Sequence, residues 1–199
     1  MNDVDGDFYT LRRKDTGEWT NAMMTYQAWM DIRSKKLAHS DWVVKVDPDS
    51  VFMPARLIYA LSSYKVPTGG VYIENCKKVM FGFFGHPEVV STEAFNIFLT
   101  QLKTCKATLD RSGLPNWKFG PYGENLFIQN CVDTFGISKV SNFTLTTDGK
   151  CTGDVPKELQ NADLNQTKWK PDCATSKSVV LHPFKKPAEF FQCLAKTQQ

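Results

Sequence analysis

The sequence contains no pair of cysteines spaced as Cys-x-x-Cys, the spacing that is typical of structural zinc sites. Its six cysteines are spread widely along the chain, at Cys76, Cys105, Cys131, Cys151, Cys173 and Cys193. Zinc binding by these thiols is therefore not expected. The even count permits disulfides, and the pair that we expect is Cys151 with Cys173, across a polar loop.

Long apolar runs are also absent, since no stretch of about 18 consecutive apolar residues exists. No segment of this chain should therefore span a membrane, and its first residues, MNDVDGDFYT, do not resemble a secretion signal. A strong excess of one charge is missing as well, because 24 Lys and Arg face 21 Asp and Glu, for a net charge of +3. This mild and scattered balance argues against a nucleic-acid partner.

The composition that is present favours a folded domain with a sizeable core. The chain is 42% hydrophobic and 13% aromatic, and its 199 residues fit a single domain, 1–199. Apolar periodicity predicts alternating helices and strands, and therefore an α/β sandwich around a mostly parallel sheet. The expected strands cover residues 42–46, 71–73, 80–84 and 179–181, and the expected helices begin at Thr20, Pro54, Ser91, Glu124 and Pro187. Residues 146–178 are polar and are expected to form a long loop.

Two carboxylates follow the first predicted strand, in the segment DWVVKVDPDSVF. Pro48 favours an extended backbone at Asp47, and residues i and i+2 of an extended chain point to the same side. Asp47 and Asp49 should therefore converge, which is unfavourable unless a cation lies beside them. Oxygen ligands of this kind suit Mg²⁺ or Mn²⁺. The alternative is a simple turn in which Asp49 caps the following helix.

Several single residues allow two interpretations each. His182, which precedes Pro183, is either a surface histidine at a strand end or a metal ligand. His86 follows Gly85 and belongs either to a structural turn or to a substrate contact. Glu124 is either a first-turn acid that stabilises the helix dipole or a functional carboxylate.

Two segments satisfy the N-glycosylation pattern, Asn142-Phe143-Thr144 and Asn165-Gln166-Thr167. Such sequons favour the secretory pathway but also arise by chance. The sequence alone leaves the compartment open.

Four motifs in this order resemble those of nucleotide-sugar glycosyltransferases of the GT-A fold, in particular fringe-like and β-1,3-galactosyltransferase-like enzymes. They are DWVVKVDPDSVFMPARL, FGFFGHPEVVSTEAFNIF, GPYGENLFIQNCVDTFGI and VLHPFK. The resemblance runs from about Gly17 to Cys193. It implies a three-layer α/β/α sandwich with a mixed, mostly parallel sheet, whose first βα unit is shortened or missing here.

The resemblance also implies roles for individual residues. Asp49 and His182 would hold a Mn²⁺ or Mg²⁺ ion that bridges the diphosphate of a nucleotide-sugar donor, and Asp47 would contact the metal or the ribose of the nucleotide. Glu124 would face the hydroxyl of a glycan or protein acceptor. Candidate substrate contacts are Gly85, His86, Trp117, Tyr122, Asn125 and Lys185, although the aromatic pair among them is equally compatible with core packing.

One departure from the family pattern concerns catalysis. In the Gly-Glu-Asp motif of the family the acid is usually the final aspartate, whose position is Asn125 here, and an amide cannot accept a proton at neutral pH. Either Glu124 takes this role, or the enzyme retains anomeric configuration and needs no base, or the chain is inactive. The alternatives to a transferase of the secretory pathway, expected in the Golgi lumen, are an inactive GT-A-like domain that binds glycans or proteins and a metal-dependent phosphoesterase.

Overall fold

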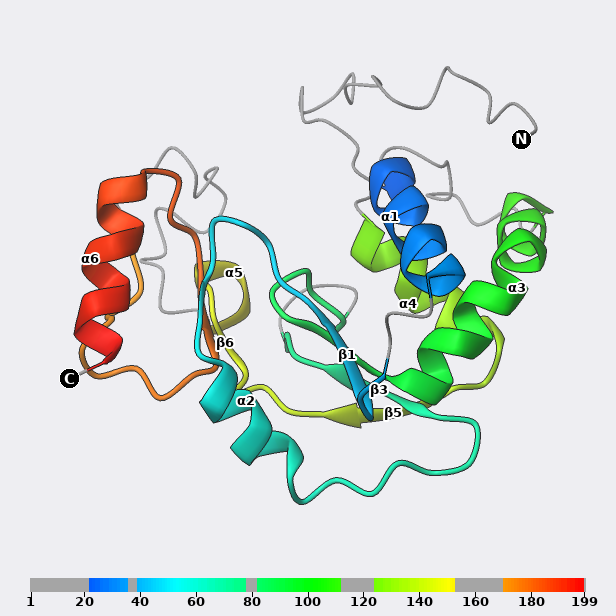
Figure 1. The fold of residues 1–199 in the computed structure, drawn as a ribbon, viewed down its shortest axis with the longest axis horizontal. Helices are drawn as coiled ribbons and strands as arrows, with labels where there is room; N and C mark the ends of the chain where they lie inside the picture. The colour runs from blue at the N-terminus through cyan, green and yellow to red at the C-terminus, as the bar shows by residue number, and fades with distance from the viewer. Residues whose placement is uncertain (1–21, 36–38, 78–81, 112–123, 153–169, 199) are drawn as a thin grey trace. The chain divides into compact units, whose positions relative to one another are not determined.

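A computed structural model describes residues 22–35, 39–77, 82–111, 124–152 and 170–198 (Figure 1). The predicted helix start at Thr20 and the candidate contacts Trp117 and Tyr122 lie outside these residues. Within the described part of the chain, no helix combines the length and the apolar character that crossing a bilayer would require.

Helices and strands alternate along the chain, as the periodicity predicts. Their bounds are α1 Ala22–Ser34, β1 Trp42–Lys45, β2 Val51–Phe52, α2 Pro54–Leu61, β3 Val71–Glu74, β4 Glu88–Ser91, α3 Thr92–Arg111, α4 Glu124–Thr134, β5 Ser138–Ser141, β6 Thr146–Thr147, α5 Gly149–Thr152, β7 Val180–Leu181 and α6 Pro187–Thr197. The strands form one sheet in the order β1-β4-β3-β5 and a second in the order β2-β7-β6. The α/β class is therefore confirmed, whereas the GT-A arrangement and the single-domain assignment stay predictions.

The chain divides into two compact units. Unit 1 comprises residues 1–43, 67–72 and 90–138, and unit 2 comprises residues 44–66, 73–89 and 139–199.

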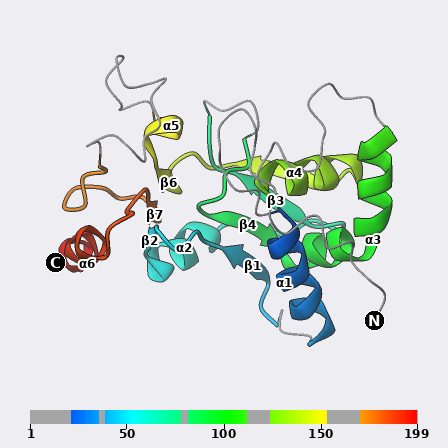
Figure 2. The same ribbon diagram turned by 90° about the horizontal axis from the view of Figure 1, so that it is seen from above.

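Unit 1 contains the three helices α1, α3 and α4, which lie together in both ribbon views (Figures 1 and 2). The apolar stripe of α3, formed by Phe95, Phe98, Leu99 and Leu102, is buried. The ring centroid of Phe98 lies 5.4 Å from that of Trp29 and 6.2 Å from that of Phe127. A disulfide between Cys105 and Cys131 joins α3 to α4. These contacts explain why helical periodicity was a sound guide here.

Unit 2 contains the small sheet β2-β7-β6 and helix α6. Val51 pairs with Leu181 in antiparallel register, and Thr147 pairs with Leu181 in parallel register on its other side. Val51 and Leu181 are fully buried and share a core with Phe184 and Cys193, against which the half-buried residues Met53, Cys173, Phe190 and Leu194 pack. The paired strands therefore fix the positions of the residues that follow β6 and β7.

The disulfide expected between Cys151 and Cys173 is wrong. The structure pairs Cys76 with Cys151, Cys105 with Cys131, and Cys173 with Cys193, so that no cysteine is free. The expectation rested on the short distance in sequence between Cys151 and Cys173. Cys151 instead pairs with Cys76, which follows β3 and lies 75 residues earlier in the chain. Three disulfides indicate an extracellular or secretory-pathway location.

Two further element predictions need correction. Of the strand expected over 80–84, the described residues 82–84 are not a strand, because the side chain of Asn75 takes both hydrogen bonds of the Phe84 backbone, at 2.8 and 3.0 Å. The next strand, β4, begins only at Glu88. The loop expected over 146–178 instead begins with β6 and α5, and its residues 153–169 lie outside the described ones. The four residues of the first predicted strand, β1, are all half-buried.

Candidate metal centre

The candidate site is built in unit 2 from residues that follow strands β1, β6 and β7 and from the loop before β4. Backbone hydrogen bonds fix these segments. The Ser50 N–H donates to the Asp47 carbonyl at 3.1 Å, and the His182 N–H donates to the Thr147 carbonyl at 3.1 Å. The Phe184 N–H donates to the Asp49 carbonyl at 2.8 Å, which ties the β1 end to the β7 end.

Three side chains from different segments meet at one point. One potential ligand atom each of Asp47, His86 and His182 lies within 4.8 Å of the other two. The Oδ2 atom of Asp47 lies 3.3 Å from Nδ1 of His86, and the rings of His86 and His182 stack with centroids 3.7 Å apart. Both histidines precede a proline, and both His–Pro peptide bonds are cis.

Asp49 completes the cluster on the side of His182. Its Oδ2 atom lies 3.3 Å from Nε2 of His182 and forms an ion pair with Lys185. The structure therefore places the three ligands that the resemblance implies, Asp47, Asp49 and His182, around one locus. It adds His86, which sequence reasoning treated as a turn residue or a substrate contact.

Asp148 is a buried member of the cluster that the sequence analysis missed. Its Oδ2 atom lies 2.7 Å from Nδ1 of His182 and 3.4 Å from Nε2 of His86. A carboxylate that accepts from Nδ1 of a histidine fixes the ring and leaves Nε2 available as a ligand. The sequence feature that could have indicated it is Asp148-Gly149, which follows Leu145-Thr146-Thr147 in a region expected to be a loop.

Two lysines offset the negative charge of the cluster. Nζ of Lys45 lies 2.6 Å from Asp47 Oδ1 and 3.8 Å from Glu88 Oε1. Lys185 is half-exposed and pairs with Asp49. Asp47 thus pairs with Lys45, and Asp49 pairs with Lys185. These positive charges reduce the electrostatic repulsion between the carboxylates of the cluster.

The titration behaviour of these groups reflects the same contacts. Burial by itself would raise the pKa of Asp47, Asp49 and Asp148, but hydrogen bonds from the histidines and the nearby positive charges outweigh it and lower the pKa of all three. Burial would lower the pKa of His182, but hydrogen bonds to Asp148 and Asp49 raise its pKa above 6.5. Deprotonated carboxylates are the form that binds a cation.

The donor set fits a divalent cation. Oδ2 of Asp49 and Nε2 of His86 are both buried, and the groups that face them are ionisable members of the same cluster, namely His182 and Lys185 for Asp49 and Asp148 for His86. Carboxylate oxygens and imidazole nitrogens gathered in this way are the donor types that a divalent metal ion takes. Imidazole nitrogens combined with carboxylate oxygens suit Mn²⁺ better than Mg²⁺, which prefers oxygen ligands alone.

The remaining predicted site residues have different surroundings. A Cβ atom at Gly85 would lie 3.2 Å from Oδ2 of Asp47, so the absence of a side chain lets this loop approach the carboxylate. Asn125 is half-buried in the first turn of α4, which begins at Glu124 and belongs to unit 1. The side chain of Glu124 lies outside the described residues.

In comparisons with known proteins, no protein-family model matches the chain, and no curated protein matches its sequence significantly.

Proposed function

We propose that the protein is a metal-dependent glycosyltransferase of the GT-A type, which moves a sugar from a nucleotide-diphosphate donor to a hydroxyl acceptor. The observation that carries the proposal is the meeting of Asp47, His86 and His182 within 4.8 Å. The sequence motifs that contain the first and last of these residues are the ones that resemble the metal-binding motifs of that fold. The proposal is supported because residues from motifs that are far apart in the sequence lie close together in space.

The residues of the cluster have distinct tasks in this proposal. Asp47, Asp49, His86 and His182 hold Mn²⁺, which when bound supplies a positive charge that stabilises the leaving nucleoside diphosphate. Lys185, whose side chain is 49% exposed beside Asp49, contacts a phosphate oxygen of the donor.

Binding of Mn²⁺ and of nucleoside diphosphates, measured by isothermal titration calorimetry, tests the proposal. We expect wild-type protein to bind a nucleoside diphosphate only with Mn²⁺ present. His182→Ala and Asp49→Asn should lose this binding. The matched controls are His39→Ala and Asp172→Asn, because both residues are exposed and lie outside the cluster. Unchanged binding in His182→Ala would rule out the assignment.

A second candidate function is an inactive GT-A-like domain that binds a glycan or a protein partner, and Asn125 is the residue that favours it. Transfer or hydrolysis of nucleotide sugars above the background of His182→Ala separates the two candidates. If the wild type is inactive and Asn125→Asp gains transfer activity, then the amide is the cause of the inactivity.

A further inference from the structure

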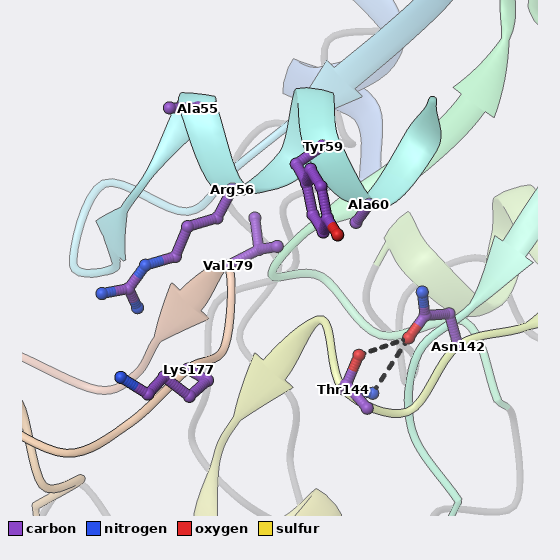
Figure 3. A pocket seen from close by; sticks show the side chains of 8 residues that line it. All are labelled: Ala55, Arg56, Tyr59, Ala60, Asn142, Thr144, Lys177 and Val179. Carbon is purple, nitrogen blue, oxygen red and sulfur yellow. Dashed lines mark hydrogen bonds between the residues drawn. The ribbon is translucent and has the colours of Figure 1, made fainter. Parts of the chain in front are cut away.

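A groove in unit 2 lies beside helix α2, and none of its lining residues belongs to the candidate metal centre (Figure 3). Its volume is about 510 Å³, within the range of small-ligand sites. We call it the α2 groove, lined by Arg56 and Tyr59 of α2, Asn142 and Thr144 of the turn after β5, and Lys177 of the segment before β7.

The walls of the α2 groove are fixed by hydrogen bonds. Nη1 of Arg56 donates to the carbonyl oxygens of Ser176 and Ser178, at 3.0 and 2.9 Å. The Val179 N–H donates to the Leu145 carbonyl at 3.0 Å, which ties the same segment to the turn that carries Asn142. The groove is therefore preformed rather than a gap between unconnected segments.

Asn142 presents its amide nitrogen to this groove. Its Oδ1 atom accepts two hydrogen bonds from Thr144, from the backbone N–H at 3.1 Å and from Oγ1 at 2.6 Å. Because a backbone N–H can only donate, the Thr144 N–H identifies its partner as the carboxamide oxygen, and the NH₂ group is left on the other side. Figure 3 shows that nitrogen pointing toward α2, where Tyr59 and Ala60 lie.

We propose that Asn142 carries an N-linked glycan whose first sugar residue lies in the α2 groove. The segment Asn142-Phe143-Thr144 is a sequon, and three disulfides indicate the compartments in which this modification occurs. The donor is a lipid-linked diphosphate oligosaccharide, supplied and transferred by the secretory machinery. An N–H bond of Asn142 breaks, a bond forms between Nδ2 and the anomeric carbon, and the lipid diphosphate leaves while a base takes the amide proton.

The α2 groove has the chemistry that a sugar residue requires. Tyr59 is 83% exposed and offers an aromatic ring against which an apolar sugar face packs. Lys177 is exposed and can donate hydrogen bonds to sugar hydroxyl groups. The glycan on Asn142 would thus cover the exposed ring of Tyr59. The proposal does not depend on the metal centre or on transferase activity.

Mass spectrometry of the protein secreted from a eukaryotic host tests the modification. Enzymatic removal of N-glycans in H₂¹⁸O should convert Asn142 to ¹⁸O-labelled Asp in the corresponding peptide. Thr144→Ala should abolish the label, whereas Thr144→Ser, which keeps the sequon, should retain it. An unmodified Asn142 in secreted wild-type protein would overturn the proposal, even where Asn165 is modified.

Thermal unfolding tests the position of the sugar. We expect enzymatic deglycosylation to lower the Tm of the wild type by about 2–4 °C. The same treatment should change the Tm of Tyr59→Ala much less, because that variant lacks the ring on which the sugar packs. An equal drop in both proteins, or no drop in the wild type, would contradict packing in the α2 groove. Neither measurement involves Mn²⁺ or a nucleotide, so failure here is distinguishable from failure of the proposed function.

Discussion

The two histidines of the candidate metal centre have different neighbours, and the neighbours decide which ring atom each can offer. Nδ1 of His182 lies 2.7 Å from Asp148, which leaves its Nε2 on the side of Asp49. Nδ1 of His86 lies 3.3 Å from Oδ2 of Asp47, and its buried Nε2 lies 3.4 Å from Oδ2 of Asp148. Because the contact between His182 and Asp148 is the shorter one, His182 would be the better oriented ligand of the two.

Asp148 should act through His182 rather than as a ligand of its own. Asp148→Asn keeps the shape of the side chain but removes the charge that orients the imidazole. We expect the affinity for Mn²⁺, measured by calorimetry, to fall about 10–100-fold. Asp172→Asn, at an exposed position, is the matched control. An affinity equal to that of the wild type would remove Asp148 from the site.

Metal binding should depend on pH through His182. The groups that face it are Asp49, Asp148 and the stacked ring of His86, and Lys185 reaches it through Asp49. Its pKa is raised above 6.5, so the ring is protonated below that pKa and cannot bind a cation. Mn²⁺ affinity should thus fall as the pH decreases through the raised pKa, by up to about tenfold per pH unit. A calorimetric pH series with constant affinity between pH 8 and 6 would contradict this.

The residues of the site were predictable in part from the sequence. Asp47 and Asp49 stand out because charged residues end an apolar strand, and His182 follows another strand. Asp148 was missed because its partner His182 is 34 residues away and the intervening segment is polar. The role of Lys45 was missed as well, since a lysine within an apolar strand gives no sign of the carboxylates that it neutralises.

At the scale of elements, long periodic segments were predicted well and short ones poorly. Helices α3, α4 and α6 have an apolar face that repeats over several turns, and Gly136, with a φ of +67°, ends the turn after α4. Strands β2, β6 and β7 have two residues each, which is too few to show an alternation of apolar and polar residues in the sequence. Their order depends on pairing between distant segments, which no local pattern encodes.

The disulfide between Cys173 and Cys193 should contribute to the stability of unit 2. It closes a loop with a sequence separation of 20 residues and ties the segment before β7 to α6. Because Cys193 is buried, Cys173→Ala/Cys193→Ala is preferable to serine variants. We expect the free energy of unfolding, measured with denaturant, to fall by about 3 kcal/mol.

Cys173→Ala alone removes the same cross-link and should lose a similar amount. An unchanged denaturation midpoint in the double variant would show that the cross-link adds nothing to the packing of α6 against Val51 and Leu181.

At the scale of the whole molecule, every disulfide closes within one unit. Cys105 and Cys131 belong to unit 1, and the other four cysteines belong to unit 2. Peptide mapping without reduction should therefore yield the pair Cys76–Cys151. A peptide that joins Cys151 to Cys173 would instead support the pairing expected from the sequence.

The function proposed here depends on one cation held jointly by residues from separate parts of the chain. The most direct test is a crystal structure of the protein grown with Mn²⁺, with anomalous diffraction data collected at the manganese edge. We predict an anomalous peak about 2.0–2.6 Å from donor atoms of Asp47, His86 and His182. A peak elsewhere, or none among these three side chains at a saturating Mn²⁺ concentration, would contradict the account.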